Sequence, residues 1–139
     1  MKYDELLKAG KIHRQKISRP QIDRALKRAE RDLKTAQKLL GQDYDWAFAI
    51  AYNAVLQASR AYMFAQGFRP AAAEGHKNTF AFMNLAMGES CRELIAYFDR
   101  MRNKRNQTIY DLSGAVTETE AEQLLEKARQ FVAVIRSKV

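Results

Sequence analysis

The stretch DYDWAFAIAYNAVLQASRAYMFAQG, residues 43–67, decides how the chain folds. Read as a helix, it is apolar around most of its circumference, with two acids, Asp43 and Asp45, at the positive end of the helix dipole and Gly67 as its stop. A helix of this kind is covered by other elements on most sides. We therefore predict that it is the central helix of a bundle, and that its one polar stripe consists of Asn53, Gln57 and Arg60.

Helical signals recur on both sides of this segment. They predict helices over residues 3–9, from Pro20 to residue 40, over residues 76–87, from residue 89 to Tyr110, and after Thr117. Thr117 and Glu120 have the spacing of a capping box, which marks the start of the last helix.

The segments between the helices read as connections. Residues 1–19 comprise the short first helix and a basic connector, and residues 68–75 read as a loop and as the hinge of the chain. We find no internal repeat and no second domain. The expected fold is therefore one domain over residues 1–139, all-α, an up-and-down bundle of about four long helices plus short ones.

The charge is unevenly distributed along the chain. The net charge is +8, and residues 1–40 hold twelve Lys or Arg against five acids. Such asymmetry suits RNA, DNA, a nucleotide or an acidic protein partner, or simply a solvated helix face. Cys91 is the single cysteine, and there is neither a signal-peptide pattern nor an apolar run of about 20 residues. We expect a cytoplasmic protein that does not enter membranes.

Residues 102–111, Arg-Asn-Lys-Arg-Asn-Gln-Thr-Ile-Tyr-Asp, are the best indication of function. If Leu94, Phe98, Met101 and Ile109 form the buried stripe of a helix, Arg105 falls in the middle of that stripe. A guanidinium there calls for a carboxylate or ligand partner, a subunit interface or a cleft. The alternative is that Arg105 extends past its apolar stem to water.

Three polar side chains accompany Arg105 at helical spacing. Arg102, Asn106 and Tyr110 follow one another at intervals of four residues and form a ridge that can hold a phosphodiester. Arginine binds phosphate in a bidentate manner, asparagine orients its neighbours, and tyrosine stacks on a base or donates a proton. Taken singly, Asn106 could instead be a hydrogen-bonding residue between helices, and Tyr110 a half-buried aromatic residue.

The order and spacing of several short motifs resemble those of the HEPN domains, small all-helical proteins with an Arg-Asn-x-x-x-His signature near the end of a late helix. The matching segments span most of the chain: Arg28 to Leu40, Asp43 to Phe48 with Ala51 to Ala54, Gly75 to Lys77, and Arg105 to Tyr110.

The resemblance implies a homodimer whose signature helices face each other across a composite cleft. It further implies a partner, a small nucleotidyltransferase that acts as antitoxin, and for active members a metal-independent ribonuclease activity. This sequence has Tyr110 where the signature has histidine, and a phenol with a pKa near 10 is a poor base at neutral pH. In some members the partner adds nucleotides to a nearby tyrosine, which makes Tyr110 a candidate for modification.

Three hypotheses follow. The first is a dimeric module that binds RNA or nucleotide through Arg102, Lys104, Arg105 and Asn106 and pairs with a nucleotidyltransferase. The second is an endoribonuclease toxin in which Arg105, Asn106 and Tyr110 are catalytic. The third is a helical adaptor for protein interaction. None of the three requires a cofactor, and the sequence has no metal-ligand motif. We expect His76 to cap a helix or to pack at the surface.

Overall fold

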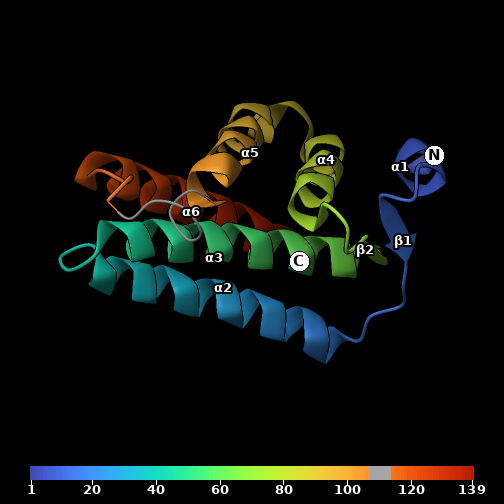
Figure 1. Cartoon of the computed structure of the whole chain (residues 1–139). Coiled ribbons are helices and arrows are strands. Elements are labelled where there is room, and N and C mark those ends of the chain that lie inside the picture. The colour runs from blue at the N-terminus through green and yellow to red at the C-terminus, as the bar shows by residue number, and fades with distance from the viewer. Residues whose placement is uncertain (107–113) are drawn as a thin grey trace.

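The computed structural model describes residues 1–106 and 114–139. Its helices are α1 (Asp4–Lys8), α2 (Arg19–Leu39), α3 (Tyr44–Ala65), α4 (Gly75–Met87), α5 (Arg92–Asn106) and α6 (Glu118–Lys138), with a 3-10 helix, η1 (Gly88–Cys91), between α4 and α5. Two short strands, β1 (Ile12–Arg14) and β2 (Phe68–Pro70), complete the elements (Figure 1). The predicted all-α helical bundle is confirmed.

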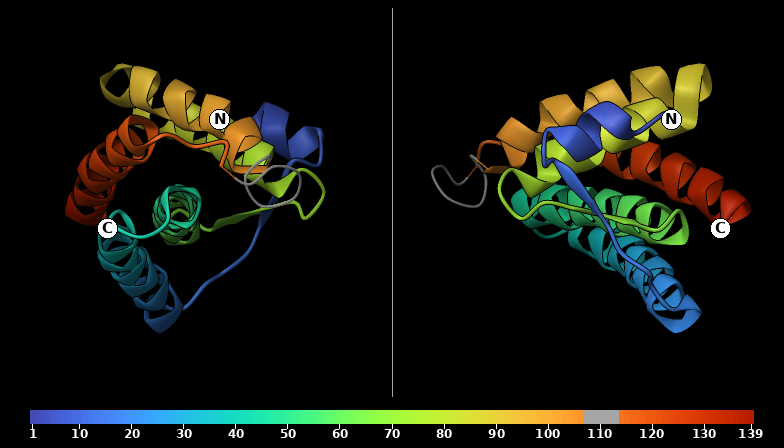
Figure 2. Two further views of the ribbon diagram at one scale, coloured as in Figure 1. Left: turned by 60° about the vertical axis from the view of Figure 1, so that its left-hand side comes forward. Right: turned by 90° about the vertical axis from the view of Figure 1, so that its right-hand side faces the viewer.

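Helix α3 lies at the centre of the bundle, as its apolar circumference predicts. It contacts α2, α4, α5 and α6, and Figure 2 shows these helices arranged around it. Small residues on α3 allow the neighbouring helices to approach closely, since Ala47, Ala51, Ala54 and Ala58 are all fully buried or nearly so. Asp43 caps the helix by accepting a hydrogen bond from the backbone N–H of Trp46 at 3.0 Å.

The polar stripe of α3 is partly internal. The Nδ2 atom of Asn53 donates to Oδ2 of Asp32 on α2 at 2.8 Å, and Asp32 is itself buried. Gln57 and Arg60 continue the stripe and line a surface cavity between α2 and α3. Asn53 therefore stabilises the packing of α3 on α2, whereas Gln57 and Arg60 lie at the surface.

Replacing Asn53 with alanine should lower the free energy of unfolding by about 1–3 kcal/mol, because the change leaves the buried Asp32 without its amide donor. Urea denaturation of the variant against the parent measures this loss. Gln57→Ala, a change on the same stripe one turn along, is the matched control. Equal losses in the two variants would contradict a role for the bond between Asn53 and Asp32.

The expected connector and loop are wrong in part, because residues 12–14 and 68–70 pair as strands, whereas the expectation of a hinge at residues 68–75 stays a prediction. β1 and β2 are antiparallel, with Ile12 opposite Pro70 and Arg14 opposite Phe68. The backbone N–H of Gln15 also donates to the carbonyl of Gly67 at 2.9 Å, and Gly67 has a φ of 87° that turns the chain out of α3. Three-residue strands are too short to give an alternating pattern in the sequence.

Aromatic packing holds the strand pair on the bundle. The side chain of Phe68 is buried, and its ring lies 5.6 Å from the ring of Phe82 on α4 and 5.2 Å from that of Tyr3. Tyr3 in turn stacks on Phe82 with 4.3 Å between ring centroids. Residues 11–19 are thereby held across one end of α3, close to the start of α4 (Figure 2).

Candidate functional site

The end of α5 places Arg105 and Asn106 against the central helix. The Nη1 atom of Arg105 donates to Oδ1 of Asn106 at 3.2 Å, and the guanidinium carbon lies 5.9 Å from the ring centroid of Tyr52 on α3. Arg105 is half-buried, and its Nε atom is buried without a hydrogen-bond partner among the described residues. Arg105 therefore does lie on a packed face of α5, and one of its donors lacks a partner among the described residues.

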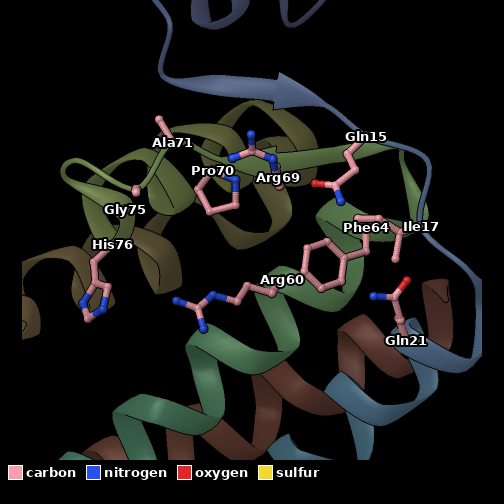
Figure 3. A pocket seen from close by; sticks show the side chains of 11 residues that line it. Gln15, Ile17, Gln21, Arg60, Phe64, Arg69, Pro70, Ala71, Gly75 and His76 are labelled. Carbon is pink, nitrogen blue, oxygen red and sulfur yellow. The ribbon is translucent and has the colours of Figure 1, made fainter.

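A residue far away in the sequence joins this group. The Nδ1 atom of His76, at the start of α4, lies 3.3 Å from the hydroxyl of the fully buried Tyr52. His76 is half-buried and also borders a cavity beneath the strand pair (Figure 3). The side chain thus packs inward between Tyr52 and this cavity, which differs from the expected cap or surface contact.

Burial and positive charge together keep His76 neutral. Its pKa is lowered to about 4, first by burial and then by the charges of Arg105, Arg60 and Arg102. Burial also raises the pKa of Tyr52, so its phenol stays protonated. We name the five side chains the cationic cluster: Tyr52, Arg60, His76, Arg102 and Arg105. An anion bound there would be attracted by three guanidinium groups and would favour protonation of His76.

The stability of the protein should depend on pH through His76. Its pKa is about 4 in the folded protein, against an ordinary value of 6.5, so the unfolded chain binds more protons between these values. The free energy of unfolding should therefore fall as the pH falls from about 6.5 towards 4. Denaturation of the parent and of His76→Gln at pH 7, 6 and 5 tests this. The variant should lose less stability than the parent on acidification, and parallel losses would contradict it.

Arg102 and Lys104 have different surroundings, although both were predicted to bind a ligand. Nε of Arg102 lies 3.3 Å from Oδ1 of Asp99, in a half-exposed pair one turn earlier on α5. Nζ of Lys104 lies 3.2 Å from Oε2 of Glu120, on α6. Arg102 is included in the cationic cluster because its charge helps to lower the pKa of His76, whereas Lys104 is tied to the neighbouring helix.

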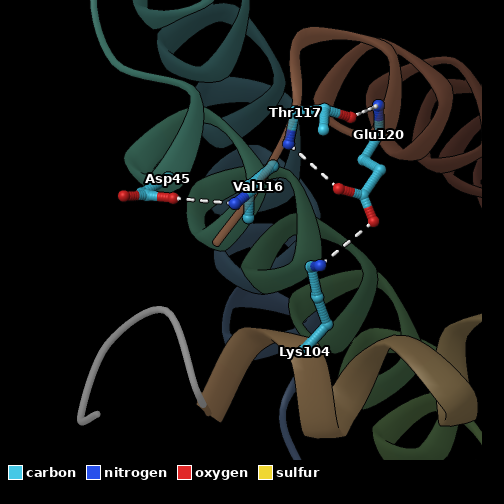
Figure 4. Close-up of polar contacts among 5 residues, drawn as sticks. All are labelled: Asp45, Lys104, Val116, Thr117 and Glu120. Atoms are coloured by element: carbon cyan, nitrogen blue, oxygen red, sulfur yellow. Dashed lines mark hydrogen bonds and ion pairs between the residues drawn. The ribbon is translucent and has the colours of Figure 1, made fainter. Parts of the chain in front are cut away.

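The Lys104 contact belongs to the anchor of the segment that enters α6 (Figure 4). Thr117 and Glu120 form the predicted capping box, with Glu120 N–H donating to Thr117 Oγ1 at 3.1 Å and Thr117 N–H donating to Glu120 Oε1 at 2.9 Å. Asp45 of α3 accepts from the backbone N–H groups of Gly114 and Val116 at 2.6 and 3.2 Å. Residues on α3, α5 and α6 therefore fix the position of residues 114–117, which lead into α6.

Tyr110, the remaining predicted site residue, lies outside the described residues. Within residues 1–106 and 114–139, no group of three or more His, Cys, Asp or Glu side chains could hold a metal ion. No helix in the same part of the chain is long and apolar enough to span a bilayer.

Sequence reasoning missed Tyr52 and His76 as members of the site. Both lie in segments that carry the family resemblance, but neither has a neighbour in the sequence that would indicate phosphate chemistry. The sequence placed Arg60 in the polar stripe of α3. Its charge, on the least polar helix of the chain, was the one signal that could have indicated a role in the site. The contact between Tyr52 and His76 joins residues on two different helices, so periodicity within one helix could not predict it.

Comparisons with known proteins agree with this architecture. The sequence model of the HEPN domain matches residues 22–138. A relative from Methanocaldococcus jannaschii, named "Putative toxin MJ0142", is 25% identical over 113 residues, which are 81% of this chain and 77% of that protein. The crystal structure of TT1696 from Thermus thermophilus is similar over 86% of this chain and 98% of that chain, with a TM-score of 0.65 and 25% sequence identity.

The family match begins in α2 and ends in α6, so it includes every element that contributes to the cationic cluster. The chain therefore belongs to the HEPN domain family.

Proposed function

We propose that the protein is a dimeric HEPN module that binds RNA or nucleotide and pairs with a small nucleotidyltransferase as a toxin–antitoxin unit. The observation that carries the proposal is Arg105, half-buried over Tyr52 with a buried Nε that has no partner among the described residues. Because Arg105 is only half-buried, a phosphate oxygen would accept from its guanidinium, which Asn106 already contacts through Nη1. Arg102 and Lys104 would add positive charge along the same helix.

Dimerisation would bring two copies of this arginine to one cleft. The proposal rests on the family resemblance and on the position of Arg105 at the end of α5, where a second copy could complete the site. Sedimentation velocity of the purified protein tests it, because a dimer and a monomer of a 16.0 kDa chain separate clearly. A monomer at every concentration would contradict this part of the proposal.

The relative whose name includes the word toxin supports a toxin–antitoxin unit, and the proposal of a nucleotidyltransferase as its partner rests on the family resemblance. In the proposed modification, the phenol oxygen of Tyr110 attacks the α-phosphorus of a nucleoside triphosphate. The bond to pyrophosphate breaks, and the phenol proton is released. Incubation with a nucleotidyltransferase encoded beside this protein and with labelled ATP, followed by mass spectrometry, tests this step. The parent should gain a nucleotidyl group that Tyr110→Phe lacks, whereas equal labelling of both would place the modification elsewhere.

A second candidate function is metal-independent RNA cleavage, and the position of His76 favours it. The signature histidine is replaced by Tyr110, yet His76 supplies a neutral imidazole to the cationic cluster from another helix. In this reaction the 2′-hydroxyl gives its proton to a base and its oxygen attacks the adjacent phosphorus. The bond from phosphorus to the 5′-oxygen breaks, and that oxygen takes up a proton, leaving a cyclic phosphate and a 5′-hydroxyl.

Incubation with mixed cellular RNA in excess chelator separates the two functions. Parent protein, Arg105→Ala and His76→Gln are compared at equal folded concentration, with RNA binding measured in the same samples. Binding without cleavage supports the module, and cleavage by the parent that both variants lack supports the ribonuclease. Neither binding nor cleavage by the parent would contradict the proposed function in both forms.

A further inference from the structure

Two surface cavities adjoin each other beside α3, and they share three side chains. The larger, of about 470 Å³, lies under the strand pair and is bordered by His76, Arg69 and Gln15, among others. The smaller, of about 300 Å³, lies between α2 and α3 and is bordered by Arg24, Arg28 and Gln57. Gln21, Arg60 and Phe64 line both cavities. The two cavities are therefore neighbours on either side of these side chains, and we name them together the Arg60 groove.

The groove has a strongly positive lining. Four arginines border it, Arg24, Arg28, Arg60 and Arg69, and none of its described lining residues is an acid. None of these arginines forms an ion pair within residues 1–106 and 114–139. Arg60 is half-buried, and burial lowers its pKa, so this guanidinium has lost water without gaining a carboxylate. Such a lining suits an anion that carries several charges.

One end of the groove reaches the candidate site. In Figure 3 the guanidinium of Arg60 points from α3 towards His76, and Phe64 and Ile17 lie at the opposite end. His76 borders the groove with one side of its ring and contacts the hydroxyl of Tyr52, over which Arg105 lies. Arg105 borders neither cavity, and His76 and the buried Tyr52 lie between this end of the groove and its guanidinium.

We infer that the Arg60 groove holds the backbone of single-stranded RNA and leads the strand to His76 and Arg105. This inference rests on the proposed function and adds the path of the RNA on the protein. Arg60 and Arg69 contact phosphates next to the site, and Arg24 and Arg28 contact the phosphates beyond them. Cavities of about 470 and 300 Å³ are small, which favours a single strand.

The groove also offers contacts for the bases. Phe64 is half-buried and borders both cavities, so its ring is available for stacking at their junction. Two amides, Gln15 and Gln57, can donate to and accept from base edges, whereas the amide oxygen of Gln21 already accepts from Ser18 in the capping box of α2. Stacking and amide contacts of this kind suit single strands of mixed sequence.

Binding of a labelled 12-nucleotide single-stranded RNA, measured by fluorescence anisotropy at several salt concentrations, tests the path. Arg60→Gln should weaken binding about tenfold, as expected for a lost charge-assisted contact to phosphate. It should also make the slope of log K against log salt shallower by about 0.7. The double variant Arg24→Gln with Arg28→Gln should lower the slope by about twice that amount. Arg60→Lys should retain most of the slope, which separates loss of charge from misfolding.

Arg129→Gln is the matched control, since Arg129 contacts Gln37 and Glu126, which do not border the groove. If the groove variants bind RNA with the same affinity and salt dependence as Arg129→Gln, the inference is overturned. If Arg105→Ala loses binding while the groove variants keep it, the proposed function stands and the path is wrong. No RNA binding by the parent would overturn both. AMP is added as a competitor. If it displaces the RNA completely, and Arg60→Gln weakens AMP binding as much as RNA binding, the groove is a mononucleotide pocket and the path is also wrong.

Discussion

Arg105→Ala should lower the affinity for single-stranded RNA by about tenfold to a hundredfold. The variant loses the guanidinium, and with it a full positive charge and the proposed hydrogen bond to phosphate; hydrogen bonds to charged groups contribute about 1.5–3 kcal/mol each. Fluorescence anisotropy with the parent and the variant measures the change. Arg105→Lys is the matched control, because it keeps the charge and loses the bidentate geometry. Its RNA affinity should lie between those of the parent and Arg105→Ala.

The same variant separates RNA binding from the adaptor hypothesis. The side chain of Arg105 makes no ion pair with a described residue, and its hydrogen bond goes to the adjacent Asn106. Its removal should therefore change the free energy of unfolding by less than about 1 kcal/mol. A large loss of stability or of dimerisation, with unchanged RNA affinity, would support the adaptor and contradict the binding role.

Phe98→Ala should lower the free energy of unfolding by about 3–5 kcal/mol, the usual loss for a fully buried phenylalanine. Phe98 has no exposed surface, and its ring lies 5.3 Å from Phe131 on α6 and 5.7 Å from Tyr97. Truncation opens a cavity between α5 and α6, the two helices that Lys104 and Glu120 also join. Because domains of this size are stable by about 5–15 kcal/mol, this loss is a large fraction of the total stability.

Guanidinium chloride denaturation followed by circular dichroism measures this loss. Leu94→Ala is the control, since Leu94 lies on the same helix, one turn earlier, and is only half-buried. Leu94→Ala should lower the free energy of unfolding clearly less than Phe98→Ala does. A loss below about 1 kcal/mol for Phe98→Ala would contradict the packing of α5 on α6 through this ring.

The sequence was sufficient for the helices because their signals are local. Pro20 lies in the first turn of α2, Gly88 follows the end of α4, and Thr117 with Glu120 caps α6, as predicted. The central position of α3 followed from its apolar circumference alone. The strand pair could not be predicted, because Ile12 and Phe68 acquire their partners only when the bundle brings them together.

The candidate site was predictable only on its own helix. Arg102, Arg105 and Asn106 stood out because charge recurs at helical spacing, and the structure places Arg102 and Arg105 together in the cationic cluster. Tyr52 and His76 were missed because their contact spans 24 residues and two helices. Lys104 shows the opposite difficulty, since the sequence could not reveal that Glu120 of another helix reaches its ammonium. The prediction for Tyr110 stays a prediction.

The central claim is that RNA phosphate binds the guanidinium of Arg105, and the Nε–H resonance of this side chain in a 15N-labelled protein tests it most directly. A single-stranded RNA is added in steps, and the resonance is assigned by its absence from Arg105→Lys. The account predicts a large shift of the Arg105 Nε–H signal, with smaller shifts for Arg102 and His76. An unchanged Arg105 signal at saturating RNA, with shifts confined to other parts of the protein, would contradict it.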